Sequence, residues 1–328
     1  MVNNWSYHSS FLKIIILLIA FGTLVMYSAS SYYAEFIFKN YTHFLIKHMK
    51  WLGLGTLGYF IFSRIKYKQI KFSMNWVIII TWLLIILAFI LNPTNKPNRW
   101  LIIGGKNWLT TSDLARLMLI IYTSYFLDKY QKHINDWSFM LKKYTWIPAI
   151  TLFMIVFQPD LSSTIVISLI VLTMLIIGKV SFRYIIIIIS TGLLCTSIMI
   201  VSNEYMFKRF QVWMNQSEEI DQQQHYSMMA LGSGKLIGNG IGSSKLAHGH
   251  LPAAHTDFIL PIVGEEYGFI GISILFGLFG LVFHYGIRIV QIASDRFSLF
   301  LALGIILNLI FYFLFNVAYV IGFAPNTG

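Results

Sequence analysis

Long, almost uninterrupted apolar stretches are the feature that most constrains how this chain can fold. Runs such as 11–27, 76–91, 165–177 and 297–323 hold hardly any charged residue, and a helix needs about 20 apolar residues to cross the hydrocarbon core of a bilayer. The chain is 57% hydrophobic and only 11% charged. Since helices satisfy their backbone hydrogen bonds internally, they can span a membrane. The predicted fold class is therefore an all-α, polytopic transmembrane helical bundle.

The chain is predicted to form one membrane domain, 1–328, with nine spans and a large outer loop. The spans lie near 11–28, 44–63, 74–91, 109–127, 144–159, 162–178, 183–203, 259–286 and 297–323. The 259–286 span is interrupted by polar residues and glycines around Gly264 and Gly268. A bend is expected there because glycine adopts backbone conformations that other residues avoid.

Lysine and arginine in the short loops set the expected orientation, because cytoplasmic loops carry an excess of them. The richer side carries Arg64, Lys66, Lys68, Lys71, Lys129, Lys132, Lys142, Lys143, Lys179, Arg183, Arg288 and Arg296. The poorer side carries Lys39, Lys96, Arg99 and Lys106, with Lys47 and Lys50 at the edge of a span. This bias predicts a cytoplasmic N-terminus, with loops 92–108 and 204–258 outside. It also explains most of the net charge of +11, which is therefore no indication of nucleic-acid binding.

The long outer loop, 204–258, leads into a cluster of polar side chains, most of them ionisable, at the start of an apolar stretch. Its glycine-rich part, 232–242, permits close backbone approach to a ligand, although a flexible linker is the alternative. Ionisable groups at a bilayer are costly and mark functional sites, whereas a lone acid at a helix start is commonly a cap or dipole partner. The cluster consists of His255, Thr256, Asp257, Glu265 and Glu266.

Several ordered motifs along the chain resemble one known family. They are Asn98-Arg99-Trp100, Thr111-Ser112-Asp113 with Arg116, Gln158-Pro159-Asp160-Leu161, Gln223 with Ser227 and Ala230 to Gly234, and Leu251 to Phe258 followed by Gly264-Glu265-Glu266. In this order they resemble the SEDS proteins (shape, elongation, division and sporulation), which are peptidoglycan glycosyltransferases of the FtsW and RodA type. Met26–Ser31 is more similar to the FtsW branch than to the RodA branch.

The sequence departs from the family pattern in three places. Asp113 and Arg116 replace the usual glutamate and lysine, while keeping opposite charges three residues apart on one helix face. Ala253 replaces a common glutamate, so that acid is not essential here. The family normally continues from a P-x-T-G, here 325–328, into another loop and a tenth span, so C-terminal truncation is expected.

The resemblance implies an enzyme that polymerises lipid II into β-1,4 glycan strands at the outer face of the bacterial cytoplasmic membrane, during cell division or elongation. The alternatives are a lipid II flippase or a non-catalytic scaffold of the division machinery. Asp257 corresponds to the family's essential aspartate and is the candidate general base. The candidate substrate-binding residues are Arg99, Trp100, Ser112, Asp113, Arg116, Asp160, Arg209, Gln223, His255, Thr256, Glu265 and Glu266.

The resemblance also implies a cofactor and partners. Mg²⁺ or Mn²⁺ is a candidate helper for the pyrophosphate leaving group, with Asp257 as a candidate ligand. The expected partners are lipid II, a class B penicillin-binding protein that supplies transpeptidation, divisome or elongasome proteins, and the membrane itself; no nucleic acid is expected.

Structural alternatives stay open for the first group of candidates. Arg99 can extend to lipid headgroups, and Trp100 can be an interfacial aromatic residue. Asp113 and Arg116 can simply neutralise each other. Asp160 follows a proline at the end of a span, where an acid can cap the next helix.

Alternatives also stay open near the proposed base. His255 is either a turn residue or a side chain that orients Asp257. Of Glu265 and Glu266, one is expected to face a polar cavity and the other the membrane interface. The carboxylate in the cavity is expected either to pair with Arg116 or to hold the metal.

Overall fold

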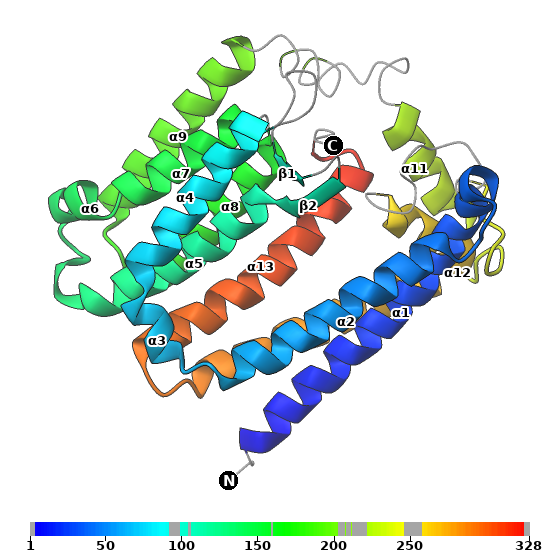
Figure 1. Ribbon diagram of the computed structural model, residues 1–328, viewed down its shortest axis with the longest axis horizontal. Helices are drawn as coiled ribbons and strands as arrows, with labels where there is room; N and C mark the ends of the chain where they lie inside the picture. Colours follow the sequence, from blue (N-terminus) through cyan, green and yellow to red (C-terminus); the bar gives the residue numbers. More distant parts are fainter. Residues whose placement is uncertain are drawn as a thin grey trace.

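The computed structural model describes residues 4–91, 99–103, 106–158, 160–202, 207, 211, 222–245 and 258–324. They form a helical bundle with one short β-hairpin (Figure 1). In chain order the elements are α1 (Asn4–Phe38), α2 (His43–Arg64), α3 (Tyr67–Phe72), α4 (Met74–Leu91), β1 (Trp100–Ile103), β2 (Lys106–Thr110), α5 (Thr111–Lys129), η1 (Gln131–His133), α6 (Trp137–Lys143), α7 (Trp146–Phe157), α8 (Leu161–Ile177), α9 (Phe182–Ser202), α11 (Gln222–Ser233), α12 (Ile259–Gln291) and α13 (Arg296–Val320). The predicted fold class is confirmed.

Each stretch predicted to span the membrane is helical over most of its described residues, although the number of spans stays a prediction. By length and apolar composition alone, four of the described helices can cross a membrane, namely α1, α4, α12 and α13, and the pair α6 and α7, bent by 55°, makes a fifth. The helices α8 and α9 are apolar but shorter over their described residues. In α5, charged residues at both ends, such as Asp113 and Lys129, leave a shorter apolar stretch.

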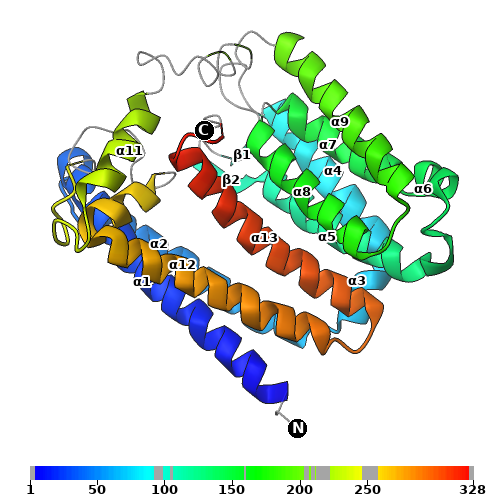
Figure 2. The ribbon, with the colours of Figure 1, turned by 180° about the vertical axis from the view of Figure 1, so that it is seen from behind.

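The helices pack as two groups that share α13. One apolar core joins α4, α5, α7 and α8 to one face of α13. The second core joins α1, α11 and the start of α12 to the C-terminal end of α13. Phe315 packs against both cores. Figures 1 and 2 show α13 between α5 and α8 on one side and α12 on the other.

The two ends of the bundle differ. Figure 1 places β1, β2, α11 and the C-terminal end of α13 at one end, and the N-terminus, α3 and the α12–α13 connection at the other. Parts of the two loops predicted to lie outside, 92–108 and 204–258, therefore share one end of the fold. We call this end the hairpin end.

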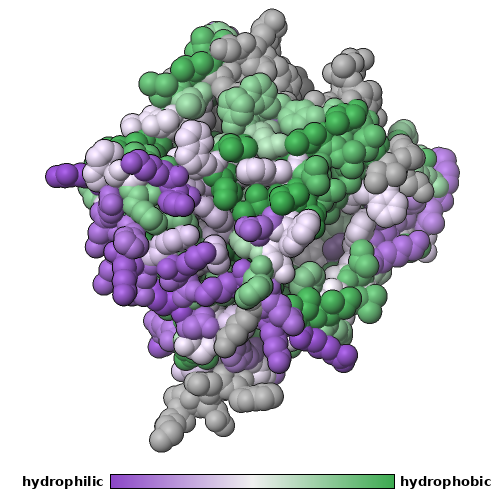
Figure 3. All heavy atoms as spheres, turned by 60° about the vertical axis from the view of Figure 1, so that its left-hand side comes forward, coloured by the Kyte–Doolittle hydropathy of each residue, from purple (hydrophilic) through white to green (hydrophobic). Residues whose placement is uncertain are grey.

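Large apolar side chains are exposed over much of the helical surface. Phe60 on α2, Ile90 on α4 and Phe269 on α12 are all more than half exposed. Figure 3 shows a broad apolar area on one face, with hydrophilic residues gathered mainly to the left of it and below it. Apolar patches of this extent are rare on water-soluble monomers, and they suit a surface that faces lipid. The chain is a multi-pass membrane protein.

Two departures from a plain helical bundle affect the site. The loop predicted at 92–108 contains the antiparallel pair β1–β2, in which Trp100 lies opposite Thr110. Sequence patterns did not predict these strands, because the paired segments are short and contain a bulge between Leu101 and Ile102. The expected bend in the 259–286 span is confirmed, since α12 is interrupted at Gly268, where φ is 64°.

Removing the Asp295 side chain is expected to destabilise the fold by about 1 kcal/mol, the usual cost of losing an N-cap. Asp295 caps α13 by accepting a hydrogen bond from the Ser298 amide at 2.7 Å. Slight burial opposes its ionisation, but hydrogen bonds from Ser298 and Tyr67 and the nearby Lys71 charge outweigh it and lower the pKa of Asp295.

The contribution of ionised Asp295 is present above the pKa of the unfolded chain and is lost as the pH falls through the lower folded pKa. Thermal unfolding of Asp295→Ala in detergent at neutral pH measures the effect, with the exposed neighbour change Ser294→Ala as control. Equal melting temperatures for the two variants would contradict the prediction.

Candidate active site

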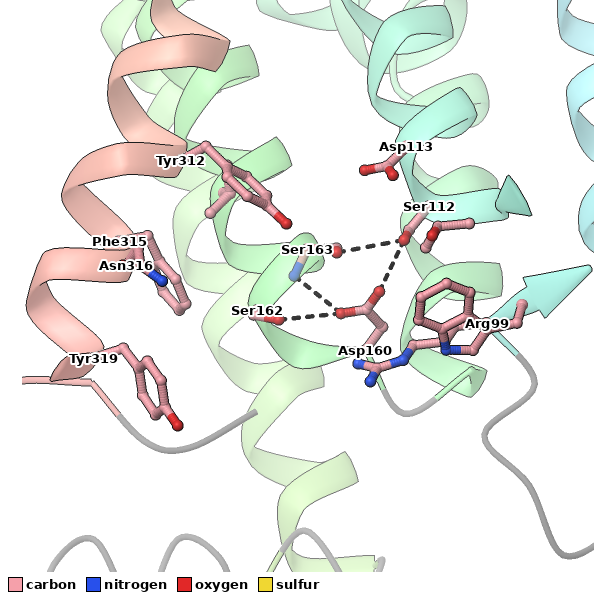
Figure 4. A pocket seen from close by; sticks show the side chains of 13 residues that line it. Arg99, Ser112, Asp113, Asp160, Ser162, Ser163, Tyr312, Phe315, Asn316 and Tyr319 are labelled. Carbon is pink, nitrogen blue, oxygen red and sulfur yellow. Dashed lines mark hydrogen bonds between the residues drawn. The ribbon is translucent and has the colours of Figure 1, made fainter. Parts of the chain in front are cut away.

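A polar cavity of about 280 Å³ lies at the hairpin end, among β1, α5, α8 and α13 (Figure 4). It is lined by Arg99, Trp100, Thr110, Ser112, Asp113, Asp160, Ser162, Ser163, Val166, Tyr312, Phe315, Asn316 and Tyr319. The lining combines charges of both signs, hydroxyl groups and aromatic rings. Such a mixture suits a ligand with polar and charged groups that enters from an apolar surrounding.

Asp160 is the hydrogen-bonding centre of the cavity wall. It is buried, and its carboxylate accepts hydrogen bonds from Ser112 Oγ at 2.8 Å, from Ser162 Oγ at 3.1 Å and from the Ser163 amide at 3.2 Å. The last bond makes Asp160 the N-cap of α8. Because a buried carboxylate is costly unless hydrogen-bonded, these donors fix its position. Both alternatives for Asp160 hold: it caps a helix and it lines the cavity.

Arg116 lies beside the cavity, between Asp113 and Tyr312. Its Nη2 donates to Asp113 Oδ1 at 2.5 Å, and its guanidinium carbon lies 4.7 Å from the centroid of the Tyr312 ring. The expected pairing of Asp113 with Arg116 is thus present. In the described part of the chain, the buried Nε and Nη1 of Arg116 have no hydrogen-bond acceptor, and Arg116 itself is not among the residues that line the cavity.

Arg99 and Trp100 reach the cavity because the hairpin is tied to α5. The carbonyl of Arg99 accepts hydrogen bonds from the amide of Thr111 at 3.0 Å and from its hydroxyl at 3.2 Å. The Arg99 guanidinium lies 5.8 Å from the Trp100 ring centroid. Both side chains line the cavity together with Asp160, so the first three motifs of the sequence meet at one site.

One wall of the cavity comes from α13, which sequence analysis treated only as a span. Tyr312, Phe315, Asn316 and Tyr319 all line the cavity, and Figure 4 shows their side chains on the side of α13 that faces Asp160. The sequence does contain a signal for this wall. Tyr312, Asn316 and Tyr319 are spaced by four and three residues in an apolar helix, and residues at these spacings share one face. Polar groups inside a membrane commonly mark a functional surface.

The expected placement of Glu265 and Glu266 was wrong. Both side chains are buried, so neither faces the membrane interface, and neither lines the described cavity. The physical reason is that each carboxylate is satisfied by the α11–α12 connection, as in the bond from Ser244 Oγ to Glu265 at 2.6 Å. Arg116 pairs with Asp113 instead of with either glutamate. Substrate binding by these two residues stays a prediction.

Helix α11 is joined to the cavity wall by a residue that sequence analysis did not select. Gln223 lies in α11, but its side chain is outside the described residues. Its neighbour Gln224 is buried and donates from Nε2 to the carbonyl of Tyr319 at 2.5 Å. Tyr319 lines the cavity, so Gln224 links the outer segment to the site.

Four predicted site residues, Arg209, His255, Thr256 and Asp257, lie outside the described residues. The residue that follows Asp257 is described, however. Phe258 is buried, and its ring centroid lies 5.1 Å from that of Tyr319. The described chain thus resumes, at Phe258, in contact with a residue of the cavity wall.

The described residues do not provide a complete cation site. Within them no group of three or more histidine, cysteine, aspartate or glutamate side chains is placed to hold a metal ion. Asp113 is engaged by Arg116, and both oxygens of Asp160 accept hydrogen bonds. The binding of Mg²⁺ or Mn²⁺ stays a prediction.

The fold and the cavity define a multi-pass helical membrane protein with a polar site at one end of its bundle. Residues 8–328 match the sequence pattern of the FtsW, RodA and SpoVE family of cell cycle proteins, and the chain belongs to this family. It is 32% identical over 317 residues to a probable peptidoglycan glycosyltransferase FtsW of Geobacter metallireducens, covering 95% of this chain and 84% of the relative. It is 28% identical to stage V sporulation protein E of Bacillus subtilis, covering 96% and 87%.

Solved structures show the same fold. One chain from a peptidoglycan synthase complex that coordinates polymerization and crosslinking superposes with a TM-score of 0.75 at 20% identity, covering 97% of this chain and 89% of that one. The rod shape determining protein RodA of Thermus thermophilus superposes with a TM-score of 0.63 at 18% identity, covering 97% and 85%.

Proposed function

We propose that this protein is a peptidoglycan glycosyltransferase that polymerises lipid II into β-1,4 glycan strands at the outer face of the cytoplasmic membrane. Relatives whose names carry this activity align with nearly the whole chain. The observation that supports the proposal most directly is the cavity, where Arg99, Asp113 and Asp160 meet the polar face of α13. The relatives named FtsW favour a role in cell division.

Asp257 is the proposed general base. The 4-hydroxyl oxygen of the acceptor sugar attacks the anomeric carbon of the donor, and its proton passes to the Asp257 carboxylate. The bond from the anomeric carbon to the pyrophosphate oxygen breaks, and its electron pair leaves with the lipid pyrophosphate. Direct displacement inverts the α-linked donor to a β-linked product. The packing of Phe258 on Tyr319 at the cavity supports this placement of Asp257.

The arginines are proposed to bind the pyrophosphate. As the leaving group departs, negative charge develops on its oxygens, and preorganised donors stabilise such charge most effectively in a site that excludes water. Arg99 lines the cavity, and Arg116 has two buried donors without an acceptor among the described residues. Arg209, His255 and Thr256, which precede the base in the chain, are proposed to contact the same substrate.

The hairpin end is proposed to face outward, with the N-terminus in the cytoplasm. The excess of lysine and arginine in the loops of the opposite end supports this orientation. It places the cavity where lipid II becomes available for polymerisation.

A class B penicillin-binding protein is the proposed partner, together with other proteins of the division or elongation machinery. The similar fold in a complex that coordinates polymerization and crosslinking supports this proposal. Its transpeptidase domain would then crosslink strands close to where they form.

The proposal is tested with the purified protein in lipid vesicles and with fluorescent lipid II. We expect a ladder of glycan strands that disappears on digestion with a muramidase. A flippase would instead move labelled lipid II across the vesicle membrane without forming polymer, and a scaffold would do neither. Either of these two results, obtained with and without a class B partner, would overturn the proposal.

A further inference from the structure

Helix α12 is interrupted at Gly268, and another part of the chain supplies the backbone hydrogen bonds that the interruption removes. In an uninterrupted helix the amides of Phe269 and Ile270 would donate to the carbonyls of Glu265 and Glu266, four residues earlier. The break at Gly268 prevents this, and it would leave these four backbone groups without helical partners, two of them on the buried residues Glu265 and Glu266.

The connection that follows α11, residues 234–245, supplies all four missing partners. We call it the latch segment. Its bonds to α12 are Asn239 N to Glu265 O at 2.9 Å, Gly240 N to Glu266 O at 3.1 Å, Phe269 N to Lys235 O at 2.9 Å and Ile270 N to Leu236 O at 3.2 Å. Because the donors and acceptors match one for one, the broken helix and the latch segment stabilise each other.

The side chain of Glu266 adds a second set of bonds to the latch segment. Its carboxylate accepts from Ser28 Oγ of α1 at 2.7 Å and from the amide of Gly242 at 3.1 Å. Ser28 Oγ is also 3.1 Å from that amide, so α1, α12 and the latch segment meet at one point. Charge-assisted hydrogen bonds of this kind are stronger than neutral ones.

The side chain of Glu265 repeats this arrangement one residue earlier. Its carboxylate accepts from Ser244 Oγ at 2.6 Å and from the amide of Lys245 at 3.0 Å. The two adjacent glutamates therefore hold successive residues of the same connection.

The backbones approach so closely that glycine is required at one contact. A Cβ atom on Gly234 would lie 1.9 Å from the carbonyl oxygen of Gly264 in α12, which is far inside van der Waals contact. Two residues earlier, a Cβ atom on Gly232 would meet no atom within 4 Å. Position 232 thus has room for a methyl group, whereas position 234 does not.

From these contacts we infer that Glu265, Glu266 and Ser28 are positioning residues for the proposed reaction, which fix the latch segment that precedes the proposed base Asp257 in the chain. This inference rests on the proposed function. The latch segment ends at Lys245, held by Glu265, and the next described residue, Phe258, packs on Tyr319 of the cavity wall.

The first test compares Glu266→Gln and Ser28→Ala with Ser31→Ala in steady-state polymerisation of lipid II. Ser31 is the matched control, because its hydroxyl donates only to the carbonyl of Ser28 in the same helix. We expect kcat of the first two variants to fall by up to roughly 100-fold, as for a misplaced reacting group, with KM within about twofold of wild type. Ser28→Thr, which keeps the hydroxyl, should restore most of the rate.

The second test uses the glycine pair, so that the inference does not depend on one variant that fails to fold. Gly234→Ala is expected to lower kcat in the same way, and Gly232→Ala is expected to match wild type. Equal activity of both glycine variants, or an unchanged kcat in Glu266→Gln, would overturn the inference.

The third test measures the position of the latch segment directly. Spin labels at the exposed positions Ile241 and Leu281, in a Cys195→Ser background, should give one narrow distance distribution in the wild type and a broad one in Glu266→Gln. A residue with only a structural role would lower the melting temperature and leave the distribution and kcat of the folded fraction unchanged, and that result would refute the positioning role.

These measurements separate the two proposals. An inactive wild type with a narrow distance distribution would contradict the proposed function. An active, Asp257-dependent wild type whose latch variants keep full kcat would contradict only the inference about positioning.

Discussion

Replacing Asp257 with alanine is expected to abolish the formation of glycan strands. In the proposed reaction this carboxylate takes the proton of the attacking hydroxyl, and a positioned general base contributes roughly 10²–10⁴-fold to a rate. Fluorescent lipid II and gel separation of the products measure the loss. Since Asp257 lies next to Phe258, which is buried against Tyr319, the melting temperature of each variant must be measured as well.

Two further variants make the Asp257 result specific. Asp257→Asn removes the charge while keeping the size of the side chain, and it should be as inactive as Asp257→Ala. Glu35→Gln removes one carboxylate from an exposed position on α1, and it should polymerise at the wild-type rate. Strand synthesis by Asp257→Asn within tenfold of wild type would exclude Asp257 as the base.

Sequence alone predicted the helices well, because the signal for a membrane span lies within one stretch of chain. The stretch 74–91 was predicted as a span and forms α4, with the same bounds. Such a helix can be recognised without knowing which other segment packs against it, since it satisfies its own backbone hydrogen bonds. The β-hairpin depends on pairing between two short segments, and single-sequence patterns do not report that pairing.

The cavity was predicted in part, for a related reason. Ser112 and Asp160 were selected as candidates from separate motifs, and the structure joins them by a hydrogen bond across 48 residues of sequence. Tyr312 and Asn316 were missed because they lie inside an apolar run, where their shared helix face is the sole signal.

The environment of Glu266 could not be inferred from sequence. Its partner Ser28 is 238 residues away, and nothing local to either residue indicates the other. The Gly264-Glu265-Glu266 motif marked the two glutamates as unusual. Their burial against the latch segment depends on tertiary packing alone. Local chemistry thus selects residues, and only the fold assigns them to the cavity or to its support.

The second large effect is expected for Arg116. Arg116→Met should lower the polymerisation rate by roughly 10²–10³-fold, the usual cost of removing one donor to developing charge. Its guanidinium lies between Asp113 and Tyr312, which both line the cavity, and two of its buried donors lack an acceptor in the described residues. Steady-state kinetics with lipid II measure the effect, and Arg288→Met, at an exposed position near the opposite end of α12, is the control.

A double variant decides between substrate binding and mere charge neutralisation. If Arg116 serves only to balance the Asp113 carboxylate, then Asp113→Asn combined with Arg116→Met removes both charges and should recover near-wild-type activity. If Arg116 binds the pyrophosphate, the double variant stays as slow as Arg116→Met, because its activity deficit does not come from an unpaired acid. We expect the second result. Recovery in the double variant would show that the Asp113–Arg116 pair has only a structural role in α5. Among the described residues, Arg99 would then remain as a cation that lines the cavity.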